Sequence, residues 1–262
     1  MKKTTRRKSK RIRSRLCGVL AFVMILSLCT GCGKKKEEKY VSPSFDEKNT
    51  RESSWDNSTV EADYNEASYG DAALEEKRKA MNFRLPTPPN PDPYYAGYYS
   101  ETAYANTFLN LAFDGAGSEW YFYDTAKVAQ ATGQTEDEVI NFREGIRKPT
   151  DYETVYFAIM YTRTTASNII ISAINPEKYV MEGLSAGNYL QNVVNKYPGR
   201  TVSAAHFLGH DSFVIDIPEE ETGVGRRVQY AYEQDGLIIL ITLTLQKEDK
   251  LEDILARFTT LK

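Results

Sequence analysis

Apolar residues are distributed unevenly along this chain of 262 residues. A first apolar block runs from residue 16 to 28, and a polar, charged stretch follows from residue 33 to about 99. From residue 101 onwards aliphatic and aromatic residues become frequent, and about 160 residues are enough for one domain with a single hydrophobic core. The pattern predicts three segments, which are residues 1–31, 32–99 and 100–262.

Within the third segment, apolar or alternating runs bounded by turn residues predict strands. Asp235-Gly236, between the last two runs, is typical of a two-residue hairpin turn and therefore indicates antiparallel pairing. The expected strands are residues 104–113, 120–123, 152–163, 168–174, 201–207, 211–217, 226–233 and 237–246.

Helices are expected where a capping residue precedes apolar residues spaced by three or four. Asp124 begins one such segment, and Thr135 with Glu138 forms the capping box of the next. Residues 251–261, including Phe258, carry an apolar stripe that predicts a closing helix over the sheet. Together these elements predict an α+β fold, in which a mostly antiparallel sheet is sandwiched by helices in an α/β/α arrangement.

The order of these elements resembles a known group of proteins. Residues 108–113 (FLNLAF) and 119–123 (EWYFY), the late Asp-Gly hairpin and the final helix are similar to small lipoproteins of Gram-positive bacteria with a PsbP-like domain. DcrB-type envelope lipoproteins share that fold. The resemblance covers residues 104–262 and implies no catalytic residue, because the group has no shared catalytic signature.

The N-terminal segment has the pattern of an export signal. Basic residues crowd the first 15 positions, and the apolar block of about 13 residues is too short to span a bilayer of about 30 Å as a helix. Leu28-Cys29-Thr30-Gly31-Cys32 resembles the lipobox of bacterial lipoproteins. The resemblance implies that residues 1–31 are a signal peptide and that Cys32 carries acyl chains such as palmitate. An uncleaved N-terminal anchor is the alternative.

Cleavage there would change both the cysteine content and the charge. Cys17 and Cys29 would leave with the signal peptide, so no disulfide is expected and the domain must depend on its core. Nine basic residues lie before Cys32; their loss leaves 24 basic against 36 acidic residues, a net charge of −12. This balance argues against a nucleic-acid partner. The membrane, reached through the lipid at Cys32, is the expected contact, with an envelope protein as a possible partner.

The polar stretch from residue 32 to 99 is expected to be a disordered tether, because it has too little apolar area to offset the entropy cost of ordering. Residues 85–93 are rich in proline and predict a stiff spacer, although such segments are also ligands for aromatic grooves. One helix is expected inside the tether, at residues 71–83, with Asp71 as its N-cap.

Gly183-Leu184-Ser185-Ala186-Gly187 matches the G-x-S-x-G motif of α/β-hydrolases. That motif needs a strand directly before it and an acid between the serine and a histidine. The expected strand ends near residue 174, and no Asp or Glu lies between Ser185 and either His206 or His210. We therefore expect Ser185 to be a helix N-cap.

The remaining candidate groups are few. His206 and His210 are the only histidines, and even with Asp211 and Asp216 nearby no metal site or cofactor is expected. Gly223-Val224-Gly225, before Arg226 and Arg227, is interpreted as a hairpin turn, because an anion-binding loop would need a following helix. Trp120 with its aromatic neighbours is expected in the core, although a ligand platform is the alternative.

These observations favour a membrane-anchored, extracytoplasmic lipoprotein that acts as a non-catalytic interaction or binding module. A small-ligand carrier is the alternative, with Thr242 and Thr244, where burial is expected to fade, as one wall of a pocket. A hydrolase is the third possibility. It would require one cleft that gathers Ser185 and a histidine with Asp211 or Glu153.

Overall fold

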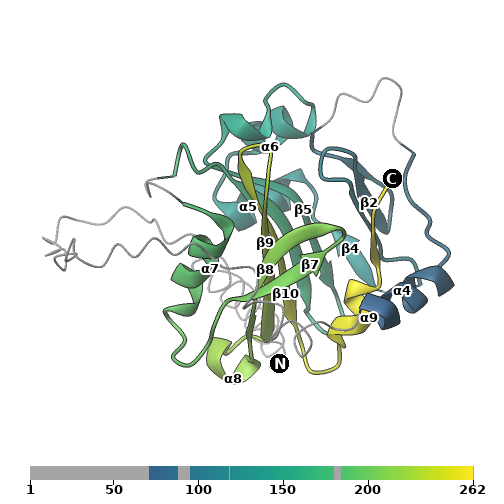
Figure 1. The fold of residues 1–262 in the computed structure, drawn as a ribbon. Helices are drawn as coiled ribbons and strands as arrows, with labels where there is room; N and C mark the ends of the chain where they lie inside the picture. Colours follow the sequence, from purple (N-terminus) through teal and green to yellow (C-terminus); the bar gives the residue numbers. More distant parts are fainter. Residues whose placement is uncertain (1–70, 88–94, 118, 180–183, 262) are drawn as a thin grey trace, which may run out of the picture. The chain divides into compact units, whose positions relative to one another are not determined.

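The computed structural model describes residues 71–87, 95–117, 119–179 and 184–261 (Figure 1). All described residues belong to one compact unit, residues 62–262. The predicted signal peptide, Cys32 and the predicted tether at residues 32–70 and 88–94 lie outside the described residues.

Seven antiparallel strands form the larger sheet, in the order β4-β5-β6-β10-β9-β8-β7. Each expected strand after residue 120 is confirmed, and Asp235 and Gly236 turn β9 into β10 with left-handed φ angles of 50° and 76°. The strands are β4 (Trp120–Phe122), β5 (Thr154–Thr162), β6 (Asn168–Ile174), β7 (Ser203–Phe207), β8 (His210–Ile217), β9 (Arg226–Gln234) and β10 (Leu237–Leu245).

A second, four-stranded sheet has the order β1-β2-β3-β11. The single strand expected at residues 104–113 is wrong, because a turn divides it into β2 and β3. Asn106 makes this turn: its Oδ1 accepts a hydrogen bond from the Leu109 backbone N–H at 2.9 Å. The strands are β1 (Tyr98–Tyr99), β2 (Ala103–Asn106), β3 (Leu111–Asp114) and β11 (Phe258–Thr259).

The closing helix is shorter than expected. Helix α9 covers only Leu251–Leu255, and Phe258 lies in β11, directly opposite Phe113 of β3. The β-branched residues after Phe258 favour a strand, and the pairing with β3 supplies its hydrogen bonds. The ring of Phe258 is fully buried between those of Phe113 and Phe207, with centroids at 5.0 and 5.4 Å. Phe258 is a core residue, as expected, but from a strand.

The predicted caps between strands are confirmed. Asp124 Oδ1 accepts from Lys127 N–H at 2.8 Å, and Thr135 and Glu138 form a reciprocal capping box. The helices before α9 are α4 (Asp71–Ala80), α5 (Thr125–Thr132), α6 (Glu136–Arg143), α7 (Ala186–Val194) and α8 (Glu219–Thr222), with a 3-10 turn at Pro149–Asp151.

Two different layers cover the larger sheet. Ile239 and Ile241 of β10 share a core with Phe113 of the smaller sheet and Ile254 of α9, so this face is covered mainly by the second sheet. The opposite face is covered by helices: α5 and α6 at one end and α7 at the other. The α+β class is confirmed, but one of the two covering layers is a sheet with short helices beside it.

Helix α4 belongs to the folded unit, although we expected it inside the tether. Figure 1 shows it beside α9, and Leu74 is buried in the main core. Lys77 Nζ lies 2.7 Å from Asp253 Oδ1, and Arg78 Nε donates to the Phe258 carbonyl at 2.9 Å. Residues before the expected boundary at residue 100 thus contact the folded unit, because Leu74 is buried in its core and Lys77 and Arg78 contact α9 and β11.

Leu74→Ala is expected to lower the free energy of unfolding by about 2–3 kcal/mol, because it removes buried apolar atoms and leaves a partly filled cavity. Glu76→Ala, on the exposed side of the same helix, is the matched control and should change it by less than about 0.5 kcal/mol. Urea melts of both variants give the comparison. Equal effects would mean that α4 does not dock on the core.

Candidate functional site

Ser185 is the N-cap of α7. Its hydroxyl accepts a hydrogen bond from Asn188 N–H at 3.2 Å, and the next amide, that of Ala186, donates to Glu233 Oε1 at 3.1 Å. Gly187 lies against the ring of Phe213 on the sheet, where an added Cβ would come within 3.4 Å. These contacts fix the start of the helix on the sheet, and the expected capping role of Ser185 is confirmed.

The two histidines lie on opposite faces of the larger sheet, because His206 is opposite Asp211 while His210 is opposite Phe207. His206 Nδ1 is 3.0 Å from Asp211 Oδ1, and its side chain is 47% exposed. The ring of His210 stacks on Tyr232 at 4.3 Å, and burial lowers the pKa of His210. Among the described residues, no group of three His, Cys, Asp or Glu side chains could hold a metal ion.

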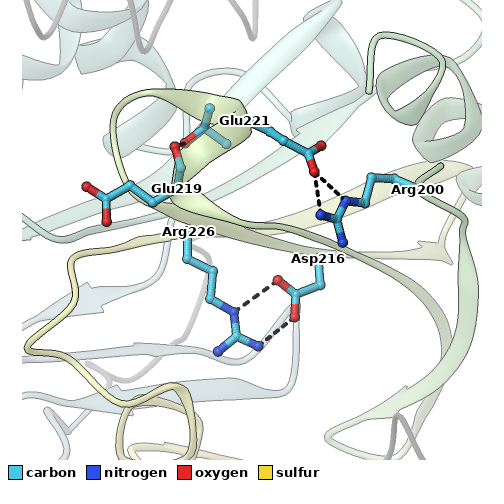
Figure 2. Close-up of polar contacts among 6 residues, drawn as sticks. Arg200, Asp216, Glu219, Glu221 and Arg226 are labelled. Atoms are coloured by element: carbon cyan, nitrogen blue, oxygen red, sulfur yellow. Dashed lines mark hydrogen bonds and ion pairs between the residues drawn. The ribbon is translucent and has the colours of Figure 1, made fainter. Parts of the chain in front are cut away.

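The acidic run before Gly223 forms helix α8, and two of its carboxylates, those of Glu219 and Glu221, form ion pairs. Glu221 accepts hydrogen bonds from Nε and Nη2 of Arg200 (Figure 2). Asp216 on β8 is held by the fork of Arg226: Nε to Oδ1 at 3.0 Å and Nη2 to Oδ2 at 2.5 Å (Figure 2). Gly223 ends α8 with a φ of 71°, and β9 follows. The glycine segment therefore leads into a strand, as expected.

Trp120 is buried against Phe113, with ring centroids 5.6 Å apart, so its expected core position is confirmed. Its neighbours on β4 and β5, and directly after these two strands, form a partly exposed cluster that we call the tyrosine patch. The Arg163 guanidinium lies 3.9 Å from the centre of the Tyr121 ring. The members of the tyrosine patch are Tyr121, Tyr123, Tyr161 and Arg163, with the Tyr123 and Tyr161 rings 4.9 Å apart.

Desolvation sets the state of one tyrosine in this patch. Burial raises the pKa of Tyr123 to about 12, and the neighbouring Tyr161 adds to the shift. Its phenol therefore stays neutral at physiological pH. The tyrosine patch presents half-buried rings with polar tips and one arginine, a composition typical of recognition surfaces.

A cavity of about 380 Å³ opens beside the β9–β10 hairpin. The rings of Tyr95 and Phe108 meet edge to face there, with centroids at 5.3 Å. The sequence marks the hairpin at Asp235 but not the cavity, because the lining residues come from distant parts of the chain. They are Tyr95, Phe108, Lys148, Pro149, Thr150, Asp235 and Leu237.

Five buried polar side chains gather on the helix-covered face of the larger sheet, and we call them the polar patch. Asn168 and Arg227 lie opposite Thr244, one on each side, while Gln229 lies opposite Thr242 and donates to its Oγ1 at 2.9 Å. Directly opposite residues share one face. Thr242 and Thr244 are 4% and 1% exposed, so the expectation that burial fades along β10 is wrong.

Comparison of the chain with known proteins gave few matches. No protein-family model and no curated protein matches the chain. A crystal structure from Bacteroides thetaiotaomicron matches 63% of this chain and 50% of its own length, at 11% identity and a TM-score of 0.30. The chain thus spans about half the length of that protein, and a likeness of this size supports no inference on fold or function.

None of the helices among the described residues has both the length and the apolar character that crossing a bilayer requires.

His210→Gln is expected to reduce the loss of stability on acidification. The folded state holds the pKa of His210 below its usual value of 6.5, so the unfolded chain binds the proton more readily. Stability therefore falls as pH drops below about 6.5. Urea melts at pH 7.5 and 5.5 should show a smaller difference in the variant than in the wild type. His206→Gln removes the other imidazole for comparison; equal effects of both would contradict the prediction.

Proposed function

We propose that this protein is a lipid-anchored, extracytoplasmic binding module without catalytic activity, and that it engages an envelope protein through the tyrosine patch. The sequence supports the anchor through the basic N-terminus, the short apolar block and Cys32 at the end of the lipobox. Release of residues 1–31 would leave an acidic protein attached to the outer face of the cytoplasmic membrane by its acyl chains.

The tyrosine patch carries the proposal for binding. Tyr121 lies opposite Tyr161 on β4 and β5, and β4 is the first strand in the order of the sheet. Tyr and Arg are over-represented among the residues that dominate binding energy at interfaces. Tyrosine has few rotatable bonds, so it loses little entropy on binding. The Arg163 stack on Tyr121 orders the patch further.

The finer proposal for the fold is a PsbP-like domain of the DcrB type. The α+β class, the antiparallel sheet, the late Asp-Gly hairpin and the short C-terminal helix support it. The second sheet on one face of the larger sheet departs from the α/β/α arrangement expected of that domain.

A small-ligand carrier is the second candidate, and the cavity beside the β9–β10 hairpin favours it. Its volume is at the small end of the range typical of ligand sites. Two aromatic rings, Lys148 and Asp235 would offer stacking and charge to a zwitterionic compound. A hydrolase receives less support, because the Ser185 hydroxyl caps α7.

The double variant Tyr121→Ala, Tyr161→Ala should lose a partner that the wild-type protein captures from membranes after cross-linking. Interface residues of this kind weaken binding by about 30-fold or more when truncated. Ile146→Ala, an exposed apolar residue outside the tyrosine patch, is the control and should retain the partner. Equal capture by all three proteins would overturn the assignment of the tyrosine patch.

Cys32→Ala should abolish incorporation of a labelled fatty acid, because it removes the expected acylation site. The protein should then accumulate as an unprocessed precursor or be released from the membrane. Metabolic labelling followed by fractionation gives both results. Label that persists on the Cys32→Ala protein would show that the anchor lies elsewhere.

A further inference from the structure

Arg227 lies on the helix-covered face of the larger sheet, and the residue is buried there. The residue is 3% exposed, and neither Nε nor Nη2 has a hydrogen-bond partner. These two nitrogens lie on one edge of the guanidinium and form the fork that binds both oxygens of a carboxylate. The two unpartnered donors of Arg227 are thus adjacent nitrogens on one edge of the guanidinium.

The neighbouring arginines show this fork in use. Arg226 directs Nε and Nη2 at the two oxygens of Asp216, whereas Arg200 directs the same two nitrogens at one oxygen, Oε1, of Glu221 (Figure 2). Both of these pairs are partly exposed to solvent. Arg227, adjacent to Arg226 but on the opposite face of β9, is the more buried and has no such carboxylate among the described residues.

The polar patch around Arg227 has further unsatisfied groups. Thr244 Oγ1 and Asn168 Oδ1 are both buried without a partner, and the register places them in one row with Arg227 across β9, β10 and β6. The row continues to Tyr161 on β5. A hydroxyl can accept or donate, whereas an amide oxygen requires a donor. The row therefore offers a cationic fork at one end and an acceptor beside it.

The unpartnered nitrogens of Arg227 lower the stability of the domain when no ligand is bound. A buried charge without a partner destabilises a protein strongly, and an apolar residue of similar volume would serve the sheet better. The aliphatic residues Ile215 and Leu240 fill positions on the same face close by. The chemistry of Arg227 is therefore better explained by a ligand than by packing.

We propose that the polar patch is a binding site for a small carboxylate that carries a hydroxyl or amino group next to its acid function. The carboxylate accepts from Nε and Nη2 of Arg227, and the neighbouring donor meets Asn168 Oδ1 with Thr244 Oγ1 between them. This site borders the tyrosine patch at Tyr161 but contains none of its residues. Its ligand is a small carboxylate and its test measures thermal stability, so its outcome is independent of the capture of a protein partner.

Lactate is the first probe, with acetate as the acid without the hydroxyl, lactamide as the neutral analogue and chloride for ionic strength. At about ten times its dissociation constant, lactate should raise the Tm of the mature protein by about 3–6 °C. Acetate should bind more weakly, and lactamide and chloride should leave Tm unchanged. Isothermal titration with lactate gives the affinity independently.

Arg227→Met should abolish the lactate response and raise the Tm measured without ligand. Arg227→Lys keeps the charge but not the fork, and should weaken lactate binding at least ten-fold. Arg226→Met is the matched control, because its fork is held by Asp216, and it should respond like the wild type. If one Arg227 variant fails to fold, the other variant and the wild-type titration still show whether lactate binds through Arg227.

Three results would overturn the proposal. The first is a wild-type Tm that responds no more to lactate than to chloride, and the second is an unchanged lactate response in Arg227→Met. The third is an Arg227→Met protein that is less stable than the wild type while added carboxylates have no effect. That result would assign the fork to a carboxylate of the chain itself.

Discussion

Strand β10 imposes the constraint on which the other layers depend. All nine of its residues are buried, and antiparallel partners on both sides, β9 and β6, satisfy its backbone. A strand buried on both faces must be covered twice, since each exposed aliphatic side chain would lose the free energy of burial. The smaller sheet with α4 and α9 covers one face, and α5, α6 and α7 cover the other. This double covering removes both faces of β10 from water, and burial of apolar surface is the dominant favourable term in folding.

The two faces of the sheet are chemically different. The face that meets the smaller sheet is lined by aliphatic and aromatic side chains such as Ile239, Tyr232 and Phe258. The helix-covered face mixes aliphatic residues with the polar patch. Polar groups can be buried when neighbours satisfy them, as Gln229 does for Thr242. Arg227 and Thr244 lack that compensation within the described chain, which is why we assign them a ligand.

Local signals in the sequence predicted local structure well. The caps at Asp124 and Ser185, the capping box of Thr135 and the Asp235-Gly236 turn are each encoded within a few residues, and the structure confirms them. The predictions that failed required knowledge of distant partners. The apolar spacing around Phe258 predicts a helix, but pairing with β3 makes this residue part of a strand. The polar composition around α4 predicts a tether, but the burial of Leu74 in the core makes this helix part of the fold.

The same division applies to the candidate sites. The sequence by itself determined the α+β class, the order of the strands along the chain and the capping role of Ser185. It also supports the export signal and Cys32 as predictions. Only the tertiary structure decided which polar groups share a surface. Arg226 and Arg227 are adjacent in sequence, but alternation along β9 sends one to Asp216 near solvent and the other into a buried row with Thr244. Register and covering layers set that difference, and neither is a local property of the chain.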